Sequence, residues 1–176
     1  MIQNAMASSD KSNMLVVAFL DIDGVLLPFD HKGVDGRVFP ASTLAALAHV
    51  VTQVPSLQLV LSSTWRVQNS FIDTIVQDFK AFGGALKNVD FMDITDPEMH
   101  SERQHEIYEW LSRHANDVQA WIALDDEELI EGEANAAYRH LFEQHVVKTD
   151  SHDGMTMEDA NVAVNLLQNQ LDRYKI

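Results

Sequence analysis

The sequence predicts a three-layer α/β domain around a central, mainly parallel sheet of five strands. Two observations support this fold class. Short apolar runs alternate along the chain with segments of helical periodicity, the pattern of strands joined by helical crossovers. Two of the runs, Leu15 to Leu20 and Ala120 to Leu124, contain no polar residue, as expected of parallel strands that helices cover on both faces. The length of 176 residues suits a single domain.

The first strand is predicted at Leu15 to Leu20, an unbroken apolar run that stops at Asp21, Asp23 and Gly24. Ligands of open α/β sheets bind at the carboxyl ends of the strands, so these aspartates are candidate site residues. Side chains two positions apart, such as those of Asp21 and Asp23, share a face only while the strand is regular. Gly24 permits the backbone to bend after them. Asp and Gly are also common in turns, so this stretch alone leaves a plain turn open.

The connection to the second strand begins with a loop from Pro28 to Phe39. Gly33, Asp35 and Gly36 mark a turn in it, which is either a small hairpin over the strand end or an ordinary surface loop. Ser42 is predicted to cap the helix that follows.

The second strand, Leu57 to Leu61, continues into Ser62, Ser63, Thr64, Trp65 and Arg66. A strand, helix, strand succession of this length implies a parallel pair with a right-handed crossover. We therefore expect these hydroxyl, indole and guanidinium groups at the same edge of the sheet as the first aspartates.

A third unit combines a helix over Ser70 to Phe82 with a weaker strand signal at Val89 to Ile94. Gly83 and Gly84 end the helix. Its predicted buried face consists of Phe71, Ile75, Val76, Phe79 and Phe82.

The next helix is predicted to begin near Arg103, because Ser101 and Gln104 have the spacing of a capping box. Its predicted buried residues are Ile107, Trp110 and Leu111. The strand that follows, Ala120 to Leu124, ends in the four acids of residues 125–128.

The chain is predicted to finish with a helix around Ala134 to Glu143, a short strand at His145 to Val147 and a last helix. Thr156 and Asp159 have capping-box spacing at the start of this helix. Its predicted apolar residues are Val162, Val164, Leu166, Leu167 and Leu171.

Composition argues against several function classes. The 27 acidic residues against 12 Lys and Arg give a formal net charge of −15, which disfavours nucleic-acid partners and acidic membrane surfaces. No cysteine is present, and no apolar run is long enough to cross a membrane. Residues 1–13 lack the features of a signal peptide. We expect a flexible leader over 1–13, one domain over 14–176 and a cytoplasmic location.

Three predicted parallel strands thus end in polar side chains that should converge. Asp21, Asp23, Ser62 and Asp125 would meet at one edge of the sheet although they are distant in sequence. Carboxylates at close range raise one another's pKa unless a cation balances them. An all-oxygen set of carboxylates suits Mg²⁺.

Four features in this order resemble the motifs of the haloacid dehalogenase-like (HAD) superfamily: DIDGVL at 21–26, LVLSS at 59–63, a basic residue at a helix start and ALDD at 123–126. The segments LSSTWR and ERQHEIYEWL further resemble the small HAD group of bacterial RNA-repair fusion proteins. The resemblance runs from about Leu15 to Leu167 and implies a Rossmann-like, HAD-like fold.

The resemblance also implies roles for the matching residues. Asp21 would be the nucleophile that becomes an aspartyl phosphate, and Asp23 the general acid and base, with its backbone carbonyl in the metal shell. Ser62 would hold the phosphoryl group; Ser63 is the alternative. Asp125 would complete the Mg²⁺ site. Asp126 would bind through water or orient the shell.

Two assignments stay open at this point. The superfamily commonly has Lys as its third-motif cation, and this chain offers Arg103 at a helix start or Lys87 in a turn; we prefer Arg103 for its typical interval before Asp125. Trp65 and Arg66 would contact the leaving group, or else Trp65 packs under the next helix and Arg66 pairs with a local acid.

The predicted elements fill the intervals between Asp21, Ser62 and Arg103, which leaves no room for a separate cap domain. Capless members tend to act on large or polymeric phosphates, although the net charge opposes a nucleic-acid end as substrate. Superfamily members that act on phosphate esters carry Asp two residues after the nucleophile, whereas dehalogenating members do not, so the resemblance at Asp23 implies a phosphatase. Our hypothesis is a Mg²⁺-dependent phosphatase acting on a phosphomonoester. The alternatives are a silent metal- and phosphate-binding regulatory domain and an acidic scaffold with incidental aspartates.

Overall fold

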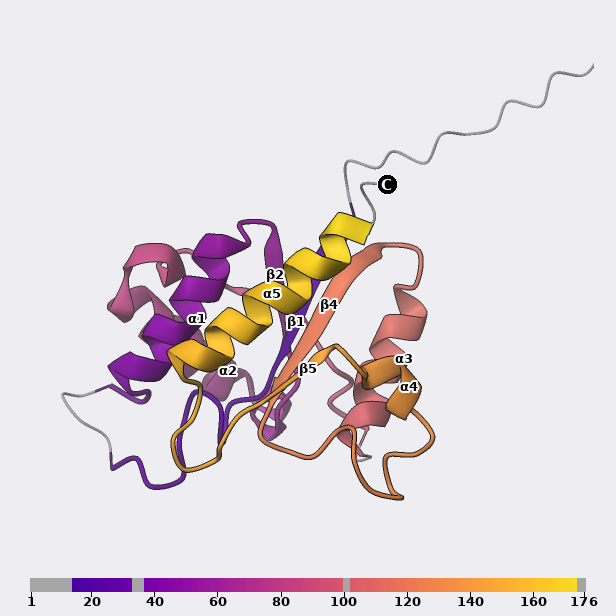
Figure 1. Cartoon of the computed structure of the whole chain (residues 1–176). Coiled ribbons are helices and arrows are strands. Elements are labelled where there is room, and N and C mark those ends of the chain that lie inside the picture. Colours follow the sequence, from indigo (N-terminus) through magenta and orange to yellow (C-terminus); the bar gives the residue numbers. More distant parts are fainter. Residues whose placement is uncertain (1–13, 33–36, 100–101, 174–176) are drawn as a thin grey trace, which may run out of the picture.

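The computed structural model describes residues 14–32, 37–99 and 102–173 and has three layers (Figure 1). Its five strands form one parallel sheet in the order β3-β2-β1-β4-β5. The strands are β1 Leu15–Leu20, β2 Leu57–Leu61, β3 Phe91–Ile94, β4 Val118–Asp125 and β5 Val146–Lys148. The helices are α1 Ala41–Gln53, α2 Asn69–Phe82, α3 Arg103–Arg113, α4 Arg139–Phe142 and α5 Met157–Arg173, with short 3-10 turns η2 Thr64–Val67 and η3 Gly84–Leu86.

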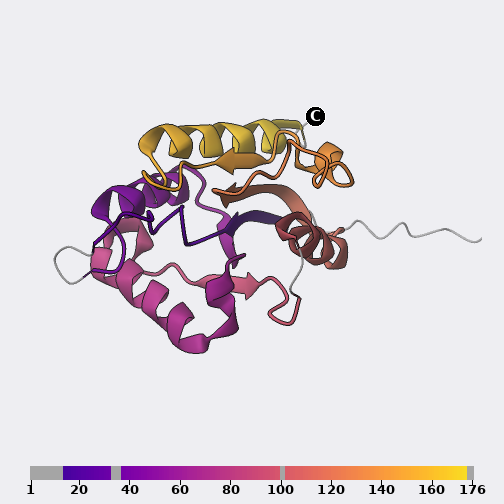
Figure 2. The same ribbon diagram turned by 90° about the horizontal axis from the view of Figure 1, so that it is seen from below.

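Helices cover both faces of the sheet, as the view in Figure 2 shows: α1, α2 and α5 lie on one side and α3 on the other. The central strand β1 is buried because its alternating side chains enter two cores. Val16, Ala18 and Leu20 pack with α1, α2 and α5, whereas Val17 and Phe19 pack with α3 and α4. The unbroken apolar run of this strand follows from this double burial.

The sheet register aligns the ends of the three middle strands. Leu20 pairs with Leu61 on one side and with Leu124 on the other. The Asp21 amide then donates to the Leu124 carbonyl, and the Ser62 amide donates to the Leu20 carbonyl. The residues that follow each strand are therefore neighbours at the carboxyl edge.

The predicted fold class and all five strands are confirmed, with changes at element ends. The strand signal at Val89 to Ile94 yields a strand only over Phe91–Ile94. The prediction of a Ser42 cap is wrong: α1 begins at Ala41, and no side chain caps it. The hydroxyl of Thr43 instead donates to the carbonyls of Leu26 and Pro40, which ties the helix start to the β1 loop.

The helix predicted around 134–143 is much shorter, four residues of α4. Side chains that bind backbone carbonyls hold the preceding segment in turns. The amide of Asn135 donates to the carbonyls of Glu128 and Glu131, and the Arg139 guanidinium donates to those of Ile130 and Gly132. These bonds compete with a helical backbone there.

The two predicted capping boxes have different outcomes. At α5, Thr156 and Asp159 bond reciprocally, as expected. At α3, Ser101 lies outside the described residues, and the Gln104 amide donates to the carbonyl of Leu129 rather than capping the helix.

One helical residue predicted to be buried is exposed: Phe71 of α2 has an exposed fraction of 40%. Phe71 lies in the first turn of its helix and contacts the ring of Trp65 instead of the core. The predicted turn at residues 33–36 lies outside the described residues. All helices and strands of the described residues belong to this one domain.

Candidate active site at the carboxyl edge of the sheet

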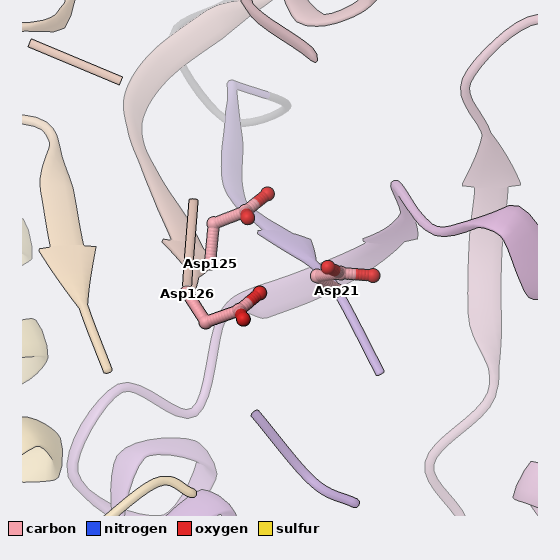
Figure 3. A group of neighbouring side chains, drawn as sticks. All are labelled: Asp21, Asp125 and Asp126. Carbon is pink, nitrogen blue, oxygen red and sulfur yellow. The ribbon is translucent and has the colours of Figure 1, made fainter. Parts of the chain in front are cut away.

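Three carboxylates meet where β1 and β4 end (Figure 3). Asp21, Asp125 and Asp126 each offer one oxygen, and these oxygens lie within 4.8 Å of one another. Asp21 and Asp125 are buried, whereas Asp126 is partly exposed. Of the carboxylates expected to converge from the parallel strands, Asp21 and Asp125 thus lie together, and Asp126 joins them.

A tight turn after Asp21 makes this close approach possible. The carbonyl of Ile22 accepts hydrogen bonds from the amides of Val25, Leu26 and Leu27. Gly24 has a φ of +73°, and a Cβ atom on it would lie 2.4 Å from Cγ of Asp126. Glycine is required at this position both for the backbone conformation and for the space.

Arg103, the first residue of α3, lies against the buried carboxylates. Its Nε is 3.0 Å from Oδ2 of Asp125, and its Nη2 is 3.4 Å from Oδ2 of Asp21. Its Nη1 donates to the carbonyl of Ser62 and lies 3.3 Å from the Ser62 hydroxyl. The exposed Lys87 follows η3 and precedes β3, so it lies toward the opposite edge of the sheet.

A buried ion pair between Arg66 and Glu106 lies next to Arg103. Arg66 Nη2 lies 2.7 Å from Oε1 of Glu106, and Arg103 Nη1 lies 3.7 Å from the other oxygen of the same carboxylate. Arg66 also donates to the carbonyls of Ser63, Asp96 and Met99. These contacts favour the local-pairing interpretation of Arg66 over contact with a leaving group.

Glu106 is a site residue that the sequence analysis missed. Its position three residues after Arg103, one helical turn away, is the signal that could have indicated it. The pairing with Arg66, 40 positions away, has no such signal.

Asp23 and Trp65 lie beside the three-carboxylate cluster. The Asp23 side chain does not belong to the cluster, and its Oδ2 accepts a hydrogen bond from the indole of Trp65. Both Ser62 and Ser63 are buried at the end of β2.

Burial sets the electrostatics of the cluster. Burial raises the pKa of Asp21 although the charge of Arg103 and a hydrogen bond from Ser63 oppose this shift. Burial also raises the pKa of Asp125 to about 8 against the opposing charge of Arg103. The pKa of Asp126 is raised for the same reason. These carboxyl groups therefore favour a cation that would replace their protons.

The donor set fits Mg²⁺. Carboxylate oxygens are its preferred protein ligands, and oxygens on opposite sides of the ion lie about 4.2 Å apart. The oxygens of the cluster lie within 4.8 Å of one another, which is close to this span. A neighbouring cavity of 520 Å³, lined partly by Arg103, Glu106 and Glu127, opens beside the cluster.

The family described as "HAD domain in Swiss Army Knife RNA repair proteins" matches residues 17–160 of the chain. The chain belongs to this family. Searches of curated proteins and of solved structures found no match. The assignment confirms the resemblance inferred from the sequence motifs and supports a hydrolase of the HAD superfamily. Among the described residues of this HAD domain, no helix is both long and apolar enough to traverse a bilayer.

Proposed function

We propose that this HAD domain is a Mg²⁺-dependent phosphatase that hydrolyses phosphomonoesters through an aspartyl-phosphate intermediate. The observation that most supports this function is the approach of Asp21, Asp125 and Asp126 beside the guanidinium of Arg103. Such a site combines a carboxylate nucleophile with positive charge for the phosphoryl oxygens.

The ion would be held by Asp21, Asp125 and Asp126, with the backbone carbonyl of Asp23 as a further ligand. When bound, Mg²⁺ supplies positive charge that offsets the negative charge of the phosphoryl group in the transition state. The raised pKa values of the ligand carboxyl groups are consistent with a site completed by a cation.

The residues of the chain have separate roles in the proposed reaction. Asp21 attacks phosphorus and forms the covalent intermediate. The Ser62 hydroxyl and the Arg103 guanidinium hold the phosphoryl oxygens, as their mutual distance of 3.3 Å allows. Asp23 gives a proton to the leaving oxygen and later takes one from the attacking water.

The decisive variant is Asp21→Asn, which removes the nucleophile and keeps the side-chain volume. We expect loss of turnover of an aryl phosphate with an almost unchanged melting temperature. Asp117→Asn is the matched control, because Asp117 is exposed and precedes β4 at the opposite edge of the sheet. Retained turnover in Asp21→Asn would refute the covalent mechanism. Binding of Mg²⁺ and a phosphate analogue without hydrolysis of any substrate would indicate a regulatory domain instead.

We propose a large phosphorylated molecule as the substrate class, since no described segment forms a separate cap over the site. A polynucleotide end is one candidate, although the net charge of −15 disfavours its approach. End-labelled DNA and RNA, compared with small phosphorylated metabolites, test this proposal. Turnover of small metabolites alone would contradict it.

A further inference from the structure

One hydrogen bond from Trp65 links the ends of two strands. Its indole Nε1–H donates to Oδ2 of Asp23 over 3.0 Å, across 42 positions of sequence. Trp65 belongs to η2, which follows β2, whereas Asp23 follows β1. The carboxyl group that the proposed mechanism uses for proton transfer is therefore held by a side chain from the neighbouring strand connection.

Packing fixes the direction of this indole. The rings of Phe39 and Phe71 lie with centroids 6.0 and 5.3 Å from that of Trp65. The next residue, Arg66, is buried and bonded to three backbone carbonyls and to Glu106, which anchors the 3-10 turn. The donor is thus oriented before any substrate binds.

The chemistry of the two groups restricts where a proton can be. An indole nitrogen only donates a hydrogen bond. Oδ2 of Asp23 is therefore the acceptor. The carbonyl oxygen of a neutral carboxyl group is a better acceptor than its hydroxyl oxygen, so this bond favours Oδ1 as the oxygen that carries the proton. The hydrogen bond distinguishes two oxygens that would otherwise be equivalent.

We propose that Trp65 is a positioning residue, whose N–H fixes the Asp23 carboxyl group so that Oδ1 exchanges the proton with the leaving group and with water. This inference rests on the proposed phosphatase function. It differs from the expectation that Trp65 contacts the leaving group.

The proton balance of the two half-reactions follows. An oxygen of Asp21 bonds to phosphorus while the bond from phosphorus to the leaving oxygen breaks, and that oxygen takes the proton from Oδ1 of Asp23. Water then attacks phosphorus and gives a proton to Oδ1, and inorganic phosphate leaves Asp21. Oδ2 keeps its bond to Trp65 throughout.

The test compares two leaving groups in Trp65→Phe, which removes the N–H and keeps an aromatic ring. Dinitrophenolate leaves without a proton, whereas the alkoxide of glycerol phosphate requires one. We expect kcat/KM for glycerol phosphate to fall at least about 10-fold more than kcat/KM for dinitrophenyl phosphate, mainly in kcat. The ratio of the kcat/KM values for the two substrates does not depend on which fraction of the preparation is folded.

Two further variants separate positioning from packing. Replacement of Trp65 by β-(3-benzothienyl)alanine keeps the ring shape without the N–H and should reproduce the effect of Trp65→Phe. Trp110→Phe removes a second indole–carboxylate bond, 2.7 Å long, to Asp93 in the buried α3 face. This control should reduce the rates for both substrates equally.

Three outcomes decide the inference. An equal fall for both substrates in Trp65→Phe would make the residue merely structural and overturn the proposal. A rise in KM confined to the aryl substrate would indicate stacking and overturn it as well. If the unmodified protein hydrolyses neither of these substrates nor an end-labelled polynucleotide, the phosphatase function itself fails, and the inference fails with it.

Discussion

The guanidinium of Arg103 lies 3.0 Å from Oδ2 of Asp125, at the junction of the first turn of α3 with the end of β4. The same group reaches Oδ2 of Asp21 at 3.4 Å. One buried cation therefore balances carboxylates from two adjacent strands. Removing it leaves two buried carboxylates without a compensating charge.

Arg103→Met should lower the free energy of unfolding by about 3 kcal/mol at pH 9 in EDTA, because two buried carboxylates lose their partner. The loss should be smaller at pH 6, where the carboxyl groups can take up protons. Urea denaturation of the variant and of the unmodified protein at both pH values measures this loss of free energy of unfolding. Arg113→Met, an exposed residue at the other end of α3, should stay within about 0.5 kcal/mol of the unmodified protein. Equal stability of the two variants would contradict the prediction.

Stability without divalent ions should depend on pH through Asp125. Its usual pKa of 3.8 applies to the unfolded chain, and burial raises the value in the folded protein to about 8. Between these values the folded state holds a proton that the unfolded state lacks. The contribution of this group to stability is therefore fully present below about pH 4 and is lost as the pH rises toward 8.

Asp125→Asn cannot ionise, so it isolates this contribution. Urea denaturation in EDTA from pH 5.5 to 9 should show a steeper loss of stability in the unmodified protein than in the variant. Mg²⁺ affinity of the unmodified protein should rise over the same interval, because the ion must displace the proton. Parallel pH profiles for the two proteins would argue against a raised pKa.

Gly24→Ala should weaken Mg²⁺ binding as well as lower the stability of the fold. Its φ of +73° strains an alanine, and the new Cβ would be 2.4 Å from Cγ of Asp126. Gly132→Ala is the matched control, since Gly132 has a φ of +90° but open space around its Cβ position. Each variant should lose about 1 to 2 kcal/mol through backbone strain. Calorimetric titration should show weakened Mg²⁺ binding only for Gly24→Ala; equal binding would indicate that Asp126 moves without consequence.

The sequence predicted the convergence of Asp21, Ser62 and Asp125 for a simple physical reason. Each residue directly follows an apolar run, and parallel strands end at a common edge. The buried residues of the helices were less predictable. Periodicity shows toward which side an apolar face points, but it does not show how many of its residues the neighbouring elements cover. Phe71 has the correct spacing, yet it lies beyond the covered part of α2 and contacts Trp65.

The contacts around the site depend on side-chain directions that residue spacing does not contain. The pairs Arg66–Glu106 and Trp65–Asp23 join segments about 40 positions apart and require turns at the strand ends. Neither pair shows a periodic pattern in the sequence. The short α4 was unpredictable in the same way, since Asn135 and Arg139 bind carbonyls that a local pattern does not identify.

The central place of β1 has a consequence for how the molecule assembles. This strand is the first of the sheet to be synthesised, but its neighbour β4 belongs to residues 118–125. A nascent chain that ends before β4 exposes one row of unpaired β1 backbone groups and lacks two of the clustered acids. Closing this loop of about a hundred residues is entropically costly and slow. A cation that binds Asp21 together with Asp125 and Asp126 would therefore stabilise the pairing of β1 with β4.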